Sequence, residues 1–228
     1  MNTNPVVFLV DVDDTLLEND RIQDDLQQHL EENCGSACRD RYWVIQEALF
    51  QELGYRDYLG ALQRYRIEHP NDIQLFSMST FLLDYPFASR LYPGALDVLK
   101  LLKTWGRTVI LSDGDVVFQP RKVERSGIYQ AVDGNVLIYI HKEDALDDVQ
   151  RRYPADHYVL IDDKLRILTA VKKAWGDRVT TVFPRQGKFA HDPAVIAAYT
   201  APDITVESIS DLLRSEFHEF LAHRNTLQ

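Results

Sequence analysis

The chain has few cysteines and no run of basic residues. Its two cysteines, Cys34 and Cys38, have no nearby pair of histidines to complete a zinc site, so reduced, partly buried thiols are the better interpretation. The formal net charge is −10, which disfavours nucleic acid as a partner because clustered lysine and arginine bind phosphate backbones. An acidic chain can still bind a small phosphate through a local metal ion and a lysine.

Long apolar runs are absent as well. No stretch reaches the roughly 18 apolar residues needed to cross a bilayer, and the N-terminus has no basic region followed by an apolar signal stretch. We therefore expect no membrane partner and a cytoplasmic location. The hydrophobic content of 45% is enough for a real core in 228 residues, which can form one large domain or a domain with an insert.

The strongest positive signal lies near the start, where residues 6–10 read VVFLV and residues 11–15 read DVDDT. An apolar run without polar alternation is typical of a strand covered on both faces, as in a parallel sheet between helices. Such sheets bind ligands beyond the carboxyl ends of their strands. Asp11 and Asp13 can face one cavity, where two carboxylates repel, so the pair predicts a metal ion. The alternative is an ordinary Asp-rich turn.

Residues 17–90 change to polar stretches with helical spacing, which interrupts the α/β alternation of the rest. Glycine and proline residues divide this block into four segments. The spacing predicts helices over about 20–34 with Asp20 as N-cap, from 36 or 40 to 53, over 58–68 and over 73–84. We predict an all-helical inserted domain over residues 17–90 and a core formed by residues 1–16 and 91–228.

After residue 92 strands and helices alternate again. The pattern predicts strands over 108–111, 136–140, 158–161, 179–183 and 204–206, and helices over 95–104, 120–126, 141–152, 165–175 and 209–222. Together with residues 6–10, four consecutive strands end in reactive polar residues: Asp11 and Asp13, Ser112, Lys142, then Asp162 and Asp163. In a parallel sheet these ends lie along one edge, so we expect a single site there.

These motifs resemble those of the haloacid dehalogenase-like (HAD) hydrolase superfamily over essentially the whole chain. The resemblance is carried by DVDDT at 11–15, VILS at 109–112, the lysine of HKED at 141–144 and VLIDD at 159–163, in order and spacing. The superfamily commonly has glycine where Asp14 stands. The resemblance implies a Rossmann-like, three-layer α/β/α core, an α-helical cap inserted after the first motif, dependence on Mg²⁺ and usually phosphatase activity.

The chemistry also follows from the residue types. A phosphomonoester dianion resists attack by anions, so a carboxylate nucleophile needs a divalent cation. Asp11 would attack and form an aspartyl-phosphate, while Asp13 would protonate the leaving alcohol and later accept a proton from water. Mg²⁺ takes about six hard oxygens, from the Asp11 carboxylate, the Asp13 backbone carbonyl, Asp163 and water. Asp162 would either bind the ion directly or support its ligands. The residues alone do not separate Asp162 from Asp163, although alignment of a lone second Asp favours Asp163.

Ser112 and Lys142 would hold the phosphoryl oxygens, and Lys142 would also keep Asp11 ionised. Thr15 is a further candidate for substrate binding, although bracing of the turn is the better interpretation of its hydroxyl. Asp113 and Gly114 extend the second motif, and Gly114 either lets a backbone amide approach the phosphate or forms a plain turn.

Two features narrow the function. There is no lysine between Leu16 and Arg90, whereas phosphonate-cleaving relatives use a cap lysine, so that branch is disfavoured. A haloacid dehalogenase does not need an acid two residues after the nucleophile, so Asp13 favours phosphoryl transfer. The sequence predicts a Mg²⁺-dependent phosphatase for a small phosphorylated metabolite, as a monomer or small homo-oligomer. The alternatives are a phosphosugar mutase and a catalytically silent phosphate-binding module.

Three polar residues follow the predicted strand over 179–183 and could line the rim of the site. They are Arg185, Gln186 and Lys188. Exposed loop residues are the safer interpretation.

Overall fold

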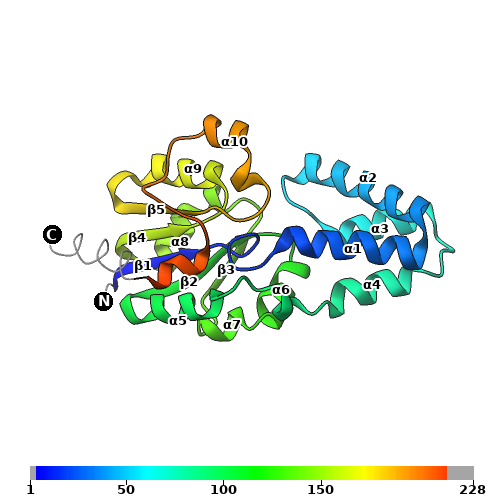
Figure 1. The fold of residues 1–228 in the computed structure, drawn as a ribbon, viewed down its shortest axis with the longest axis horizontal. Helices are drawn as coiled ribbons and strands as arrows, with labels where there is room; N and C mark the ends of the chain where they lie inside the picture. The colour runs from blue at the N-terminus through cyan, green and yellow to red at the C-terminus, as the bar shows by residue number, and fades with distance from the viewer. Residues whose placement is uncertain (1–3, 215–228) are drawn as a thin grey trace.

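The computed structural model describes residues 4–214. Its centre is a sheet of six parallel strands in the order β3-β2-β1-β4-β5-β6 (Figure 1). The strands are β1 (Asn4–Val10), β2 (Arg107–Asp113), β3 (Val136–Tyr139), β4 (Ala155–Ile161), β5 (Val179–Pro184) and β6 (Ile204–Val206). The predicted strands are thus confirmed, and β1 lies between β2 and β4 in the sheet interior.

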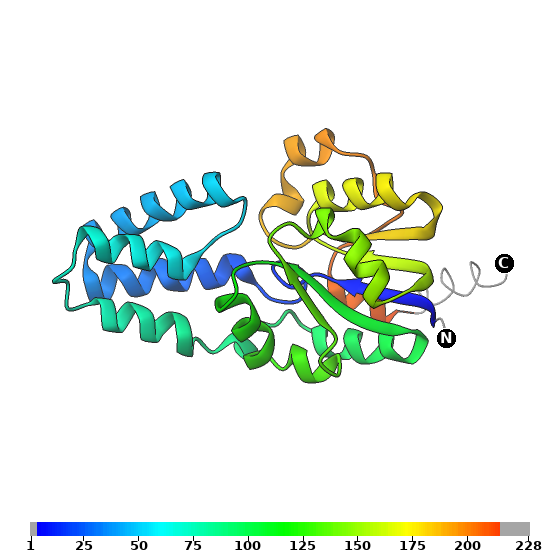
Figure 2. The same ribbon diagram turned by 180° about the vertical axis from the view of Figure 1, so that it is seen from behind.

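The apolar run of β1 is buried on both faces, as its composition predicts. Val6, Phe8 and Val10 belong to one hydrophobic cluster, whereas Val7 and Leu9 belong to a second one on the opposite face. The first face is covered by α5 (Ala95–Trp105), α6 (Phe118–Arg125), α7 (Ile128–Ala131) and a 3-10 helix (Ile209–Leu213), and the second by α8 (Leu146–Arg152) and α9 (Leu165–Trp175). Helices on both faces confirm the Rossmann-like α/β core (Figure 2).

Four helices lie beyond one end of the sheet: α1 (Asn19–Cys34), α2 (Ser36–Leu53), α3 (Tyr58–Glu68) and α4 (Leu75–Asp84) (Figure 1). They share a hydrophobic cluster of their own, to which α6 contributes Phe118. The segments that join them to the sheet run antiparallel, because Leu17 pairs with Leu91 and Tyr92 N–H donates to the Leu16 carbonyl at 2.9 Å. We call α1–α4 the helical segment; its status as a separate domain with boundaries at 17 and 90 stays a prediction.

Some boundaries differ from the predicted ones. Helix α1 begins at Asn19, so Asp20 is not its N-cap; the Asp20 carboxylate instead accepts the backbone N–H of Lys188 at 2.7 Å. The predicted helix over 141–152 is split into a 3-10 turn (Lys142–Asp144) and α8. The sequence pattern missed the short helices α7 and α10 (Pro193–Ala198).

The last predicted helix, over 209–222, is a 3-10 helix in its first five residues, Ile209–Leu213. The remainder of that prediction lies largely outside the described residues. Between residues 4 and 214, no helix combines the length and apolar character that crossing a bilayer requires. Both cysteines are free thiols, with Cys38 buried and Cys34 half-buried.

Candidate active site

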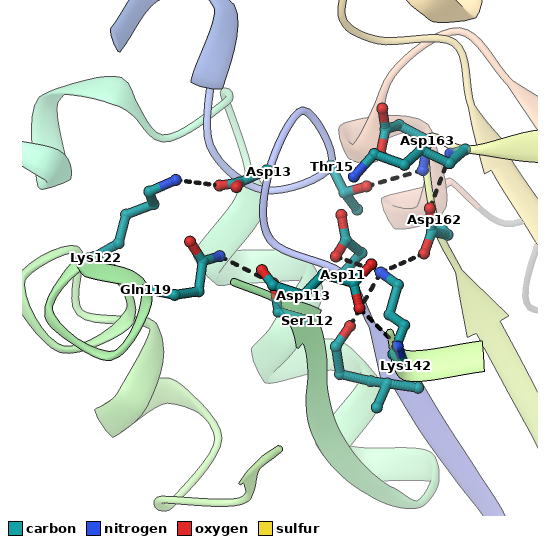
Figure 3. A network of polar contacts seen from close by, with 12 residues as sticks. Asp11, Asp13, Thr15, Ser112, Asp113, Gln119, Lys122, Lys142, Asp162 and Asp163 are labelled. Atoms are coloured by element: carbon teal, nitrogen blue, oxygen red, sulfur yellow. Dashed lines mark hydrogen bonds and ion pairs between the residues drawn. The ribbon is translucent and has the colours of Figure 1, made fainter. Parts of the chain in front are cut away.

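The carboxyl ends of four adjacent strands bring the predicted polar residues to one edge of the sheet. Asp11 follows β1, Ser112 lies in β2, Lys142 follows β3, and Asp162 and Asp163 follow β4 (Figure 3). All of these side chains are buried. The strand order explains the convergence, because β3, β2, β1 and β4 are consecutive neighbours although they are far apart in the sequence.

Lys142 is the positive centre of this edge. Its Nζ lies 2.5 Å from Asp11 Oδ1 and 2.6 Å from Asp162 Oδ2, and its side chain is 0% exposed. Burial alone would lower the Lys142 pKa, but Asp11 and Asp162 outweigh it, so this pKa lies above its usual value. Burial would likewise raise the Asp11 pKa, but Lys142 and Lys164 outweigh it and hold this pKa below its usual value. Asp11 is therefore ionised, as a nucleophile must be.

Three carboxylates have an arrangement that suits a divalent cation. Each of Asp11, Asp162 and Asp163 offers an oxygen within 4.8 Å of the others. Within residues 4–214, the buried atoms Asp11 Oδ2 and Asp163 Oδ1 have no hydrogen-bond partner. Burial and then repulsion from Asp162, Asp11 and Asp14 raise the Asp163 pKa well above its usual value, although Lys164 opposes this. Because unpaired buried carboxylate oxygens are costly, these residues fit a hard cation such as Mg²⁺.

The two aspartates after β4 differ in what they contact. Asp162 Oδ1 accepts the Lys164 backbone N–H at 2.8 Å, and Asp162 Oδ2 contacts Lys142. Burial raises the Asp162 pKa to about 6, and Lys142 limits the rise. Asp163 instead keeps Oδ1 unpartnered among the described residues, while its backbone N–H donates to Thr15 Oγ1 at 3.1 Å. Asp163 is thus better placed than Asp162 to ligate a cation directly.

Asp13 lies in the same loop as Asp11 but faces a different partner. Lys122 Nζ of α6 donates to Asp13 Oδ1 at 2.7 Å (Figure 3). It also donates to Asn19 Oδ1 at 3.0 Å. The Asp13 side chain is 21% exposed, and Lys122 contacts only one of its two oxygens. The carboxylate is therefore anchored at one oxygen, while the predicted metal role of Asp13 concerns its backbone carbonyl and stays a prediction.

The residues of the second motif, Ser112 to Gly114, are held in place by hydrogen bonds from Gln119 of α6 and by the Asp113 carboxylate. Gln119 Nε2 donates to Ser112 Oγ at 2.9 Å, and the Ser112 hydroxyl itself donates to the Asp113 carbonyl at 3.4 Å. Asp113 Oδ1 accepts the backbone N–H of Lys142 at 2.7 Å, so it holds the loop that carries the lysine. Gly114 has a φ of +156°, and an added Cβ would lie 2.6 Å from Gln119. Its amide donates to the Tyr139 carbonyl at 3.0 Å and is therefore engaged already.

Asp14 has a left-handed backbone conformation, with a φ of +59°. Residues with a Cβ rarely adopt this conformation, which explains why the superfamily commonly has glycine at this position. Asp14 Oδ1 accepts the Asp20 backbone N–H at 3.1 Å. Burial, and then repulsion from Asp20 and Asp13, raise the Asp14 pKa to about 7.

Sequence reasoning missed several residues around these carboxylates. Lys122 and Gln119 share one face of α6, since they are three residues apart, but α6 carried no recognised motif. Gln186 is buried rather than an exposed loop residue, so that interpretation was wrong: its Nε2 donates to the Asp14 and Thr15 carbonyls at 3.2 and 2.9 Å. Burial opposes a charged Lys164, but nearby carboxylates, Asp163 first, raise the Lys164 pKa well above its usual value.

Among solved structures, this chain is similar to a haloacid dehalogenase-like hydrolase from Burkholderia xenovorans LB400. The two share 61% sequence identity with a TM-score of 0.87, over 91% of this chain and 94% of that one. This protein therefore belongs to the haloacid dehalogenase-like hydrolase family, and the predicted membership is confirmed.

More distant structures share the fold. The HAD-hydrolase YfnB from Bacillus subtilis, in a form bound to magnesium, has 16% identity and a TM-score of 0.60 over 90% of this chain and 96% of that one. L-2-haloacid dehalogenase from Xanthobacter autotrophicus has the same identity and TM-score over 92% and 97%. No protein-family model and no curated protein matches this chain. The fold is thus shared with a dehalogenase, and the site residues must decide the reaction.

Proposed function

We propose that this protein is a Mg²⁺-dependent phosphatase that hydrolyses a small phosphomonoester through an aspartyl-phosphate. The observation that carries the proposal is the buried Asp11 carboxylate, which lies 2.5 Å from Lys142 in a cluster with Asp162 and Asp163. Asp13 follows two residues later and its side chain is partly exposed. A nucleophile, a candidate cation site and a second carboxyl group are the parts that stepwise phosphoryl transfer needs.

Asp11, Asp163 and the Asp13 backbone carbonyl would hold Mg²⁺, with Asp162 behind them. When bound, the ion would offset the negative charges of the carboxylates and the phosphate, so that the two can approach. The magnesium bound to YfnB, which shares the fold, supports this assignment. Lys142 and Ser112 would bind the phosphoryl oxygens. To donate to a phosphoryl oxygen, the Ser112 hydroxyl would exchange its long, 3.4 Å hydrogen bond to the Asp113 carbonyl for a bond to the substrate.

In the first half of the reaction, an Asp11 oxygen bonds to phosphorus as the bond from phosphorus to the leaving oxygen breaks. Asp13 gives that oxygen its proton. In the second half, Asp13 takes a proton from water, whose oxygen bonds to phosphorus. The bond from phosphorus to Asp11 then breaks and releases inorganic phosphate. Asp13 favours this reaction over dehalogenation, which does not need a second acid at that position.

The helical segment would act as a cap that selects the substrate. Its helices lie beyond the end of the sheet at which the candidate active-site residues gather (Figure 1). We expect the substrate to be a small phosphorylated metabolite and the enzyme to act in the cytoplasm as a monomer or small homo-oligomer.

The test is release of inorganic phosphate from an aryl phosphate and from a panel of phosphorylated metabolites, with Mg²⁺ or with EDTA. Asp11→Asn should lower turnover by several orders of magnitude, since it removes the nucleophile. Wild-type rates in that variant would end the proposal. Transfer of phosphate between positions of a sugar would instead indicate a mutase, and Mg²⁺ binding without turnover a silent binding module. Halide release from a 2-haloacid would indicate a dehalogenase.

A further inference from the structure

We propose that Lys122, which lies outside the four motifs, is a positioning residue that selects the oxygen from which Asp13 delivers its proton. The inference rests on the proposed phosphatase function and deepens it. Lys122 Nζ donates to Asp13 Oδ1 at 2.7 Å, and it comes from α6, the first helix after the second motif. The two residues are 109 positions apart, so the contact is created by the fold alone.

The chemistry of the two groups favours one position for the proton. A lysine ammonium has three donors and no acceptor, so Asp13 Oδ1 can only accept in this contact. The carbonyl-type oxygen of a protonated carboxyl group is a better acceptor than its hydroxyl oxygen, so the contact favours the proton on Oδ2. A proton that Asp13 gives to a leaving oxygen then departs from Oδ2, the oxygen that Lys122 does not contact.

Lys122 and Asp13 are buried to different extents, which suits an ion pair in which the lysine positions an accessible carboxylate. The Lys122 side chain is 1% exposed, whereas the Asp13 side chain is 21% exposed. Burying an ammonium is costly, and here a carboxylate that stays partly exposed compensates it. The lysine is thus the fixed member of the pair and the carboxylate the accessible one.

Lys122 itself has a well-determined position. Its Nζ also donates to Asn19 Oδ1 at 3.0 Å, at the first residue of α1, and lies 5.4 Å from the centre of the Phe118 ring. Phe118 packs against Tyr58 of α3, with ring centres 4.9 Å apart, inside the cluster of the helical segment. The ammonium is therefore held from both the core and the helical segment, which makes it a fixed reference point for the Asp13 carboxyl group.

The experiment compares two aryl phosphates whose leaving groups need different amounts of acid help. Phenyl phosphate has a poor leaving group and needs a proton, while 4-nitrophenyl phosphate has a good one and needs it less. We measure kcat/KM, which reports the steps up to departure of the phenol. For Lys122→Met we expect a loss of about 100-fold on phenyl phosphate and under about 10-fold on 4-nitrophenyl phosphate, since general acids contribute about 10²- to 10⁴-fold. Lys122→Arg, which keeps a donor, should recover part of the loss on phenyl phosphate.

Asp13→Asn should lower kcat/KM more on phenyl phosphate than on 4-nitrophenyl phosphate. Lys122→Met should show the same selective loss, but a smaller one. The matched control is Lys172→Met, because Lys172 also forms an ion pair, 2.8 Å from Asp203, but belongs to no part of the site. Equal losses on both substrates in Lys122→Met would overturn the proposal and leave the phosphatase function standing.

A second measurement does not depend on activity. Crystal structures of Lys122→Met and Lys172→Met should show the Asp13 carboxyl group displaced in the first and unchanged in the second. If the wild-type protein hydrolyses no phosphate ester, the proposed function fails and proton delivery by Asp13 fails with it, while these structures still show whether Lys122 holds the Asp13 carboxyl group in place. An Asp13 side chain that keeps its place without Lys122 overturns it.

Discussion

The Thr15 hydroxyl accepts a hydrogen bond from the Asp163 backbone N–H at 3.1 Å, although 148 residues separate the two in the sequence. Both residues are buried, and each lies in the loop that follows a central strand, β1 or β4. The bond joins the loop of the nucleophile to the loop of the candidate metal ligand. Residues that fix metal ligands in this way commonly change affinity by about 10- to 100-fold when they are replaced.

Thr15→Val should therefore weaken Mg²⁺ binding by about tenfold, because it removes the acceptor and keeps the shape of the side chain. Titration calorimetry with MgCl₂ measures the dissociation constant directly. Thr15→Ser is the control, since it retains the hydroxyl and should stay close to wild type. Identical affinities in the valine and wild-type proteins would show that the bond does not position Asp163.

The convergence of the strand ends could be predicted because it depends on short-range patterns. The run of β1 without polar alternation indicates a strand buried on both faces, and polar residues directly after such strands meet at one edge of a parallel sheet. Asp11, Ser112, Lys142 and the Asp162–Asp163 pair could be identified in this way. The Rossmann-like core follows from the same alternation of strands and helices.

The residues that brace this edge could not be predicted, because their role depends on packing between distant elements. Lys122 looks like one of several charged residues in the segment PRKVER, and only the approach of α6 to residue 13 gives it a partner. Gln186 looks like a loop residue after β5. It is buried because that loop folds back onto the carbonyls of residues 14 and 15. Neither contact has a sequence period that could reveal it.

Asp163→Asn should weaken Mg²⁺ binding more than Asp162→Asn. Asp163 Oδ1 has no partner among residues 4–214, while both oxygens of Asp162 are already in contact with Lys142 and the Lys164 amide. Replacing a directly bound carboxylate with a neutral amide removes one negative charge from the ligands of the cation. We therefore expect at least a tenfold difference in Mg²⁺ affinity between the two variants. Calorimetry with MgCl₂ at constant ionic strength provides the comparison. A larger effect of Asp162→Asn would reverse the assignment.

Lys142→Met should destabilise the metal-free protein by about 3–5 kcal/mol, because it leaves Asp11 and Asp162 buried without their compensating charge. Urea unfolding in EDTA measures this loss. Adding Mg²⁺ should restore more stability to the variant than to the wild type, since the ion supplies the missing positive charge. Lys172→Met, at an ion pair that is one-third exposed, should cost about 1 kcal/mol or less. Equal losses in the two variants would contradict the central role of Lys142.

Asp14→Asn should make the protein more stable at high pH and change it little at low pH. The folded-state pKa of Asp14 is raised to about 7 by burial and by Asp20 and Asp13, above a value near 4 in the unfolded chain. Between these two values the folded state holds a proton that the unfolded state has lost. Wild-type stability therefore falls as the pH rises from about 4 to 7, and the loss is complete above that range.

The asparagine side chain keeps an acceptor for the Asp20 N–H and tolerates the φ of +59°, but it carries no charge. The gain over wild type should reach roughly 2–4 kcal/mol at pH 8.5 and be small near pH 4, as measured by urea unfolding in EDTA. Asp14→Gly should show the same dependence on pH with a constant offset, because glycine also relieves the backbone and loses the acceptor. A gain that is equal at both pH values would mean that the buried Asp14 carboxylate is not what destabilises the loop.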